Sequence, residues 1–390
     1  MFKIRTHNTI ATSGLSQFDQ QSYQVEAELP AADAVLLRSH SLHTKQFEPS
    51  VKAIARAGAG VNNIPVNRCS EQGIVVFNTP GANANAVKEL VICALLLASR
   101  GIVQGIDYSQ QQAQSNDNQA LSVLLEQQKK QFKGCEIKGK TLGVIGLGAI
   151  GALVASDAIA LGMKVVGYDP AISVEAAWRL PASVEKMENI NALLKRCDYV
   201  TLHVPFLPQT ENLINSDNLS KMKPGACLLN FSRSEIVDSD AVLTALEHQV
   251  LQQYLCDFPD VNLINHPKVT MMPHLGASTR EAEANCADMA VAQLKDFLEN
   301  GNIKHSVNMP DIALERTTQY RLTFINHNVP GVLGEVLSIL AKVNVNVIDM
   351  LNKSRNEVAY NILDTEQALT DETLQQIEQL EHVTQVRQLS

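Results

Sequence analysis

The sequence of 390 residues lacks any uncharged apolar stretch long enough for a membrane helix, which needs about 18 residues or more. Residues 1–7 also lack the apolar core of a secretory signal. No basic stripe runs along the chain and the net charge is −9, which disfavours a nucleic acid or a membrane surface as the main partner. With 45% hydrophobic and 19% charged residues, the composition is that of a globular protein, which we expect in the cytoplasm.

Paired cysteine motifs are also missing. Seven cysteines are scattered along the chain without a C-x-x-C pair, and their number is odd. Zinc sites and disulfide frameworks typically show paired motifs and even counts. The pattern therefore predicts reduced, mostly buried thiols and no metal site.

The most informative stretch that is present runs from Lys140 to Gly151. An apolar run, typical of a buried parallel strand, ends in Gly146, Gly148 and Gly151, which have the G-x-G-x-x-G spacing of a dinucleotide-binding turn. Gly146 is expected to allow a tight turn, Gly148 to let the backbone approach a pyrophosphate, and Gly151 to let a helix pack on the strand. That helix, over residues 149–161, would point its first amides at the phosphates.

A second apolar run, residues 163–168, ends in Asp169, which lies 18 positions after Gly151. This is close to the spacing of about 20 residues at which a carboxylate accepts hydrogen bonds from the adenosine ribose. Three glycines after an apolar run also occur in ordinary turns, and Asp169 is the feature that favours a cofactor. Because a carboxylate repels a 2′-phosphate, the sequence predicts NAD rather than NADP.

Other short apolar segments are predicted as strands. In the first 80 residues they are 34–38, 53–56 and 73–77, and later strand-and-loop units are 199–204, 226–233, 254–257 and 268–278. The loops that follow parallel strands are where ligands bind, although ordinary turns use the same glycine, asparagine and proline residues. Strands that alternate with helical stretches predict doubly wound α/β sheets.

Three longer segments are predicted between or after these strands. Residues 86–106 form an apolar helix that is too short and interrupted for a membrane span and is expected between domains. The glutamine-rich residues 109–133 are expected as a solvated insertion or helix, and residues 281–299 as an amphipathic helix followed by a linker at 301–310. From residue 320 onward, strands and helices in the order βαββαβ predict a small α+β domain.

Two side chains suit hydride-transfer chemistry. Arg233 and His274 each follow a predicted strand of the cofactor sheet, at the edge where a dinucleotide binds. An imidazole, with an unperturbed pKa of about 6.5, can exchange a proton with a hydroxyl group near neutral pH. A guanidinium can hold a carboxylate through two hydrogen bonds. Taken alone, each residue also fits a structural role, in a surface ion pair or in a loop.

Together these features resemble the D-2-hydroxyacid dehydrogenase family. The resemblance rests on Arg38-Ser39, residues 56–64, the glycine turn, Asp169-Pro170, residues 230–233, Asp257 and residues 273–278. It covers residues 1–310, and the remainder resembles an ACT regulatory domain. It implies a substrate-binding domain of residues 1–95 with 280–308, a Rossmann NAD-binding domain of residues 96–279, and an ACT domain of residues 318–390.

The resemblance also implies roles for individual residues. Arg233 would hold the carboxylate and the carbonyl oxygen of the substrate, and His274 would be the acid/base. The other residues implied in substrate binding are Arg38 and Ser39, at a phosphate group, and Gly60 and Val61, through backbone amides. The residues implied in NAD binding are Gly146, Gly148, Ala149, Ile150, Gly151, Asp169, Val204, Pro205, Thr210, Asn230, Phe231, Ser232, Asp257, His274, Gly276 and Ala277.

One position departs from the family. The resemblance implies a glutamate shortly after Asp257 that orients the catalytic imidazole and raises its pKa. Residues 257–263 contain no glutamate, and Asp260 is the nearest carboxylate. We therefore assign the orienting role to Asp260.

The resemblance of the tail implies an effector. In ACT domains the loop after the first strand binds a small amino acid, often between two copies, and here Asn326, Asn328 and Asn346 have suitable amide groups. Surface asparagines are also common in turns. The implied effector is L-serine, and the implied assembly is a homodimer or homotetramer.

The activity implied by the resemblance is NAD-dependent oxidation of 3-phospho-D-glycerate. Two alternatives stay open. The substrate could instead be glyoxylate, hydroxypyruvate or 2-oxoglutarate, which need a cation such as Arg38 less than a phosphate does. The protein could also be a non-catalytic NAD-sensing scaffold, against which Arg233 and His274 count.

Overall fold

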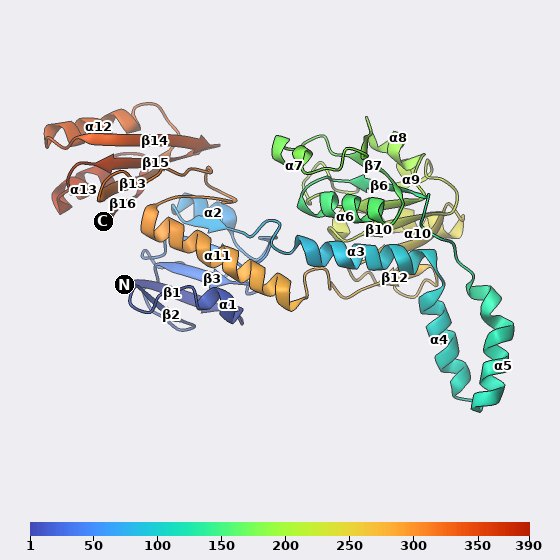
Figure 1. Ribbon diagram of the computed structural model, residues 1–390. Coiled ribbons are helices and arrows are strands. Elements are labelled where there is room, and N and C mark those ends of the chain that lie inside the picture. Colours follow the sequence, from blue (N-terminus) through green and yellow to red (C-terminus); the bar gives the residue numbers. More distant parts are fainter. The chain divides into compact units, whose positions relative to one another are not determined.

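A computed structural model describes all 390 residues and divides the chain into two compact units (Figure 1). Unit 1 consists of Met1–Asn83 with Arg280–Ser390, and unit 2 of Ala84–Thr279. Unit 2 begins with α3 (Ala84–Ser99), whose buried side chains share an apolar core with α6 (Ala149–Ala160). The first unit therefore ends before α3, whereas the sequence placed the boundary after residue 95.

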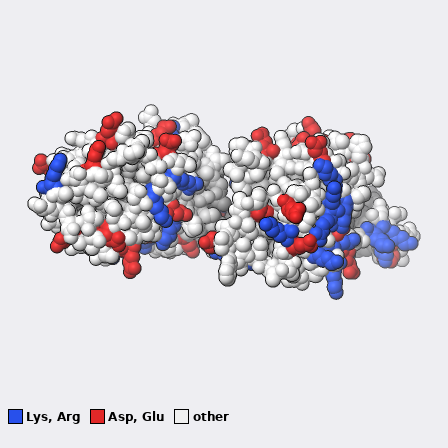
Figure 2. Space-filling view, turned by 90° about the horizontal axis from the view of Figure 1, so that it is seen from above, with Lys and Arg blue, Asp and Glu red and all other residues white.

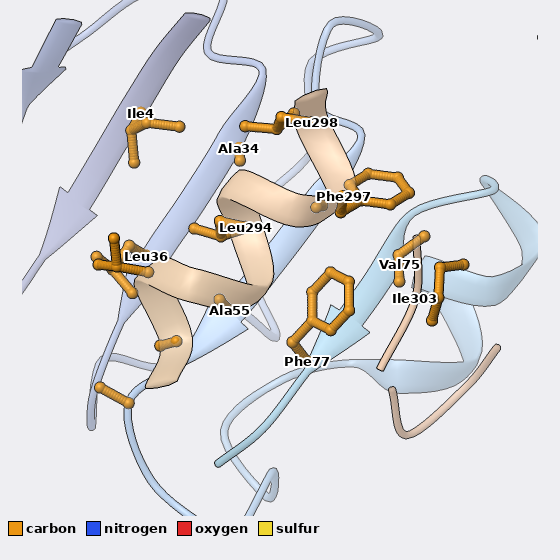
Figure 3. Close-up of a cluster of buried hydrophobic side chains, with 14 of the residues drawn as sticks. Ile4, Ala34, Leu36, Ala55, Val75, Phe77, Leu294, Phe297, Leu298 and Ile303 are labelled. Carbon is orange, nitrogen blue, oxygen red and sulfur yellow. The ribbon is translucent and has the colours of Figure 1, made fainter. Parts of the chain in front are cut away.

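The N-terminal part of unit 1 is a five-stranded parallel sheet. In spatial order its strands are β2 (Tyr23–Glu26), β1 (Phe2–His7), β3 (Ala34–Leu37), β4 (Ala53–Arg56) and β5 (Val75–Phe77). Helix α11 (Arg280–Asn300) covers one face, where Leu294, Phe297 and Leu298 lie against the strands (Figure 3). The remaining helices are α1 (Thr12–Leu15) and α2 (Val66–Glu71). A second apolar cluster covers the other face, which explains why every residue of β3 and β5 is apolar and buried.

Unit 2 is built on a seven-stranded parallel sheet. In spatial order its strands are β12 (Val269–Met271), β11 (Leu251–Cys256), β10 (Ala226–Asn230), β9 (Tyr199–Leu202), β6 (Thr141–Ile145), β7 (Lys164–Tyr168) and β8 (Glu185–Lys186). Its shorter helices are α7 (Val174–Trp178), α8 (Ile190–Leu194), α9 (Ser216–Leu219), η2 (Ser234–Ile236) and α10 (Ser239–Glu247). The chain order reverses between β6 and β9, and this switch point is where doubly wound sheets bind dinucleotides. The predicted doubly wound fold is confirmed.

The single helix predicted over residues 86–106 is wrong in its second half. The structure ends α3 at Ser99 and begins a new helix, α4 (Ile102–Ala113), after Gly101. A Cβ on Gly101 would lie 3.0 Å from the carbonyl oxygen of Phe132, so the backbone between the two helices packs closely against residue 132. The glutamine-rich segment forms the rest of α4, α5 (Asn118–Gln128) and η1 (Lys129–Phe132), which contain no buried residue and extend from unit 2 as a hairpin (Figure 1).

The C-terminal part of unit 1 is an antiparallel α+β domain. Its elements are β13 (Tyr320–His327), α12 (Val332–Lys342), β14 (Val347–Arg355), β15 (Val358–Thr365), α13 (Asp371–Glu378) and β16 (Val383–Leu389), with the strand order β14-β15-β13-β16. Leu322, Phe324 and Leu363 pack on one side against the two helices. The alternate residues Ile325, Tyr360 and Ile362 join the core around α11 instead. The predicted βαββαβ order is confirmed, and both faces of its sheet are covered except along the edge strand β14.

Two arginines attach this C-terminal sheet to the end of α11. The Arg387 guanidinium lies 4.5 Å from the centre of the Phe297 ring and donates to the carbonyl oxygen of Leu298 at 2.9 Å. Arg321 is fully buried, pairs with Asp364 through two hydrogen bonds of 2.6 and 2.9 Å, and donates to the carbonyl oxygen of Asn300 at 2.9 Å. Cationic side chains thus satisfy the carbonyl groups that the helix leaves unpaired at its C-terminus.

The surface carries charges of both signs. On the face that Figure 2 shows, acidic and basic side chains occur on both units. No helix in the structure combines the length and the apolar character that a membrane crossing requires.

Candidate functional site

The glycine turn lies between β6 and α6 of unit 2. Gly146 has φ +92°, and a Cβ atom there would lie 2.5 Å from the carbonyl oxygen of His203. A Cβ on Gly151 would lie 2.0 Å from the carbonyl oxygen of Gly146, so any side chain would push α6 away from the turn. Around Gly148, the N-cap of α6, no atom lies within 4 Å of the Cβ position. The turn therefore requires glycine at 146 and 151, and the space beside Gly148 is open.

The groups around this space fit a dinucleotide. Gly148 and Ala149 are exposed and Ile150 is half-buried, so the first-turn amides of α6, which have no intrahelical acceptor, are accessible to a pyrophosphate. Asp169, after β7, accepts from the backbone N–H of Leu147 at 2.8 Å and of Ala171 at 3.0 Å. A carboxylate has about four acceptor positions, so it can still accept hydrogen bonds from ribose hydroxyls.

The loop after β9 forms the other side of the switch point. It contains Val204, which packs against the core of unit 2, and the exposed Pro205. The Thr210 hydroxyl donates to the carbonyl oxygen of Pro205 at 2.7 Å and so closes the loop. Burial lowers the pKa of His203 to about 3, so this imidazole stays neutral near neutral pH.

The loop after β10 carries Arg233. The buried Asn230 accepts from the N–H of Ser232 at 3.1 Å and donates to the carbonyl oxygen of Arg233 at 2.8 Å. Ser232 donates to the carbonyl oxygen of Leu202 at 2.6 Å, and Phe231 lies in the apolar core. Asn230, Phe231 and Ser232, which were predicted as cofactor contacts, thus also hold the loop itself in place. The Arg233 guanidinium forms no ion pair with the protein, so its charge is available to an anion.

The loop after β12 carries His274. This residue is exposed and has φ +57°, a backbone conformation in which a histidine is uncommon. The Asp257 carboxylate, only 1% exposed, accepts from the N–H groups of Leu275 and Gly276, each at 2.7 Å. The Phe258 ring contacts the imidazole edge-on, with 5.1 Å between ring centres. Asp257 therefore fixes the backbone beside His274, and half-buried Ala277 continues this loop.

Asp260 and His274 are not connected by a hydrogen bond in the structure. The Asp260 carboxylate accepts from the N–H of Asn262 at 2.9 Å, and its own N–H donates to the Met271 sulfur at 3.1 Å. No hydrogen bond connects it to the imidazole, so its orienting role stays a prediction. The function of Asp257 in holding the loop was not predicted, because nothing in the sequence indicates which amides a carboxylate binds.

All of these loops leave the same edge of one parallel sheet. The glycine turn follows β6, Arg233 follows β10 and His274 follows β12, and parallel strands end at a common edge. Unit 2 thus brings a dinucleotide turn, an unpaired guanidinium and an exposed imidazole to one side. This set of groups can bind a nucleotide and an anionic substrate and can transfer a proton.

The predicted substrate residues other than Arg233 lie in unit 1. Arg38 follows β3 and forms an ion pair with Glu283 of α11 at 2.8 Å. Ser39 is exposed beside it, and the half-buried Gly60 and Val61 follow the neighbouring strand β4. Two substrate loops therefore leave the carboxyl ends of adjacent strands of this sheet.

Two of the three predicted effector residues, Asn326 and Asn328, lie at the first loop of the C-terminal domain, whereas Asn346 precedes β14 at the opposite end of the sheet. Asn326 is buried and accepts at 2.8 Å from Asn361, which in turn accepts at 2.6 Å from Asn352. These three side chains form a ladder across β13, β15 and β14. Asn328 donates to the carbonyl oxygen of Asn356 at 3.2 Å, and Asn346 is exposed. Sequence reasoning missed Asn361 and Asn352, which join the ladder only through the strand register.

Known proteins are similar over both parts of the chain. Residues 92–276 match the D-isomer specific 2-hydroxyacid dehydrogenase NAD binding domain, and residues 320–382 match the ACT domain. The chain is 36% identical over 332 residues to the D-3-phosphoglycerate dehydrogenase of Synechocystis sp., covering 80% of this chain and 57% of that protein. It is 34% identical to the protein of the same name from Methanocaldococcus jannaschii, covering 82% and 59%.

A solved structure has a similar fold. The cofactor (NAD+)-bound 3-phosphoglycerate dehydrogenase of Entamoeba histolytica is 26% identical, with a TM-score of 0.62, over 80% of this chain and 99% of that one. The chain spans 57% and 59% of the length of the two curated relatives above. The matched residues, the strand order and the glycine turn agree in making residues 92–276 similar to the D-isomer specific 2-hydroxyacid dehydrogenase NAD binding domain and residues 320–382 similar to the ACT domain.

Proposed function

We propose that the protein oxidises 3-phospho-D-glycerate to 3-phosphohydroxypyruvate with NAD, the first step of L-serine biosynthesis. The observation that carries this proposal is that Arg233 and His274 follow β10 and β12 on the edge where the glycine turn lies. The names of the curated relatives support the same reaction.

The proposed roles follow from the chemistry of the side chains. Arg233 donates hydrogen bonds to the substrate's carboxylate and to the oxygen on carbon 2, which orients that carbon. His274 takes the proton of the hydroxyl group as the carbon–hydrogen bond breaks. NAD+, when bound, accepts the hydride with its electron pair. In the reverse direction His274 returns the proton to the carbonyl oxygen.

We assign the substrate's phosphate to the loop that carries Arg38 and Ser39. A phosphate dianion competes well for a guanidinium, because the bond is charge-assisted and bidentate. The ion pair between Arg38 and Glu283 is more than one-third exposed on both sides, so exchanging it for the substrate costs little. We also assign to the substrate the backbone amides of Gly60 and Val61, in the loop after β4.

A spectrophotometric assay tests this function. With NAD+ and 3-phospho-D-glycerate we expect NADH absorbance to rise, and the reverse reaction with 3-phosphohydroxypyruvate to be faster than with glyoxylate, hydroxypyruvate or 2-oxoglutarate. A preference for an unphosphorylated acid would mean that this acid, and not 3-phospho-D-glycerate, is the substrate. No turnover of any of these acids would favour a non-catalytic scaffold.

We propose L-serine as the effector of the ACT domain. Asn328, the exposed Asn352 at the end of the ladder and the loop that precedes α12 offer amide groups of the kind that an amino acid needs, and the first amides of α12 can bind a carboxylate. Millimolar L-serine is expected to lower turnover, and D-serine is the matched control, because it differs only in configuration. Equal turnover with and without L-serine would leave the domain without this role.

We also propose that the protein forms a homodimer or homotetramer in the cytoplasm. The edge strand β14 exposes Ile348 by 50% and Met350 by 40%, and an unpaired edge with apolar side chains suits pairing with a second copy. All seven cysteines are free thiols, as suits a reducing compartment. Sedimentation analysis that finds only monomer would exclude the assembly.

A further inference from the structure

Two asparagine side chains form hydrogen bonds with the backbone of the loop that carries Arg38 and Ser39. Asn8 directly follows β1, which pairs with β3 in the sheet. Its side-chain oxygen accepts from the N–H of Ser39 at 3.0 Å and from the N–H of His40 at 2.7 Å. One carboxamide oxygen thus holds two successive amides of the loop.

The second asparagine, Asn63, bonds to this loop from the β4 side, whereas Asn8 bonds to it from the β1 side. Asn63 lies in the loop after β4, the other neighbour of β3, and is only 8% exposed. Its side-chain nitrogen donates to the carbonyl oxygen of Arg38 at 3.1 Å and to that of His40 at 2.7 Å. This bond also ties the loop after β3 to the loop that contains Gly60 and Val61.

These hydrogen bonds do not involve the two side chains that are proposed to bind the phosphate. Four backbone groups of residues 38–40 are bound by the two carboxamides, whereas the Arg38 guanidinium and the Ser39 hydroxyl take no part. The His40 ring stacks on His7 at 4.4 Å, which further restricts the loop on the β1 side. A loop that is ordered before binding loses less conformational entropy when an anion binds.

The conformation of Asn8 supports this function. Its φ is +68°, a region that asparagine tolerates better than most residues. The residue is exposed, so packing does not explain why the chain adopts this conformation. The left-handed backbone instead brings the carboxamide to the two amides of the neighbouring loop.

We infer that Asn8 and Asn63 are positioning residues that hold residues 38–40 as a preformed phosphate-binding loop and thereby set the preference for a phosphorylated substrate. This inference rests on the proposed function, in which Arg38 and Ser39 bind the substrate's phosphate. Neither asparagine takes part in the proton or hydride transfer.

The test compares two substrates that differ only in the phosphate group. For the wild-type protein and for Asn8→Gly, kcat/KM is measured for 3-phosphohydroxypyruvate and for hydroxypyruvate. Glycine removes the carboxamide but allows the positive φ, so backbone strain does not contribute. We expect the ratio of the two kcat/KM values to fall at least 10-fold, through a higher KM for the phosphorylated substrate, while kcat changes less than about twofold.

Three further measurements decide the outcome. Asn212→Gly is the matched control, because Asn212 is exposed, has φ +47° and uses its carboxamide in no hydrogen bond, and its ratio should equal that of the wild type. Hydrogen exchange at residues 39 and 40 should become faster in Asn8→Gly while β3 and β4 stay protected. Asn63→Asp, which loses the donor, should change the ratio in the same direction as Asn8→Gly.

The failures of the two proposals are distinguishable. A wild-type protein that does not prefer the phosphorylated substrate overturns the proposed function and this inference with it. A wild-type protein that has the preference, together with an unchanged ratio in Asn8→Gly, overturns only the inference. An equal loss for both substrates would also overturn it, because the asparagine would then support the fold and not the phosphate site.

Discussion

His274→Asn is expected to lower kcat for 3-phospho-D-glycerate oxidation by about 10²–10⁴-fold, the usual contribution of a general acid/base. Asparagine suits this test because His274 has φ +57°, a conformation that asparagine adopts readily. The carboxamide can still form a hydrogen bond with the substrate but cannot take its proton. Steady-state kinetics with saturating NAD+ measure the effect.

Binding of the nucleotide is the control for this variant. His274 is itself implied beside the nicotinamide, but the glycine turn and Asp169, implied at the pyrophosphate and the adenosine, lie on other strands. The affinity for NADH, measured by the change in nicotinamide fluorescence, should therefore stay within about threefold of the wild type. A variant that binds NADH normally and retains wild-type kcat would remove His274 from the proton transfer.

Arg321→Met is expected to destabilise unit 1 by about 3–5 kcal/mol. The arginine and Asp364 are both fully buried, and removing one partner leaves the other as an uncompensated charge. Burial opposes ionisation of Asp364, but hydrogen bonds from Arg321 and from the Thr317 N–H, with the charge of Arg321, outweigh it and hold the pKa below its ordinary value. The single tryptophan, Trp178, lies in unit 2, so hydrogen exchange at Leu322 and Leu363 is the suitable measurement.

Two variants show whether the buried charge causes this effect. The double variant Arg321→Met with Asp364→Leu should regain most of the lost stability, because two apolar side chains leave no unpaired charge. Arg196→Met breaks an exposed ion pair with Glu185 and should leave the stability nearly unchanged. Equal destabilisation by the single and the double variant would mean that the shape of Arg321, and not its charge, holds the sheet to α11.

The sequence predicted most of the fold because its signals are local. The apolar runs that became β3, β4, β6 and β7 are short, buried and followed by turn residues, and the glycine spacing belongs to one turn. β1 and β2 were missed, because most of their residues are only half-buried and their sequences contain several charged or polar side chains. The break at Gly101 was missed because a single glycine does not by itself end a helix, and the close packing against Phe132 joins residues that are distant in sequence.

The site was predicted less completely, because side-chain partners depend on tertiary contacts. Asp257 holds the loop beside His274 across 18 positions of sequence. Asp260 is a carboxylate close by, but its bonds are to Asn262 and to the Met271 sulfur. Asn230 and Ser232 were expected to flank the cofactor, and the structure shows them bound to the backbone of their own loop and of β9. Residue type alone does not distinguish a group that binds a ligand from one that builds the loop.

Transfer of deuterium tests the central claim most directly. The protein is incubated with NAD+ and 3-phospho-D-glycerate that carries deuterium on carbon 2, and the recovered nucleotide is analysed by mass spectrometry and NMR. Hydride transfer at the edge of the unit 2 sheet predicts NADH with one deuterium at carbon 4 of the nicotinamide ring, and little or none after the His274→Asn substitution. Recovery of unlabelled, unreduced NAD+ from the wild-type protein would contradict the account.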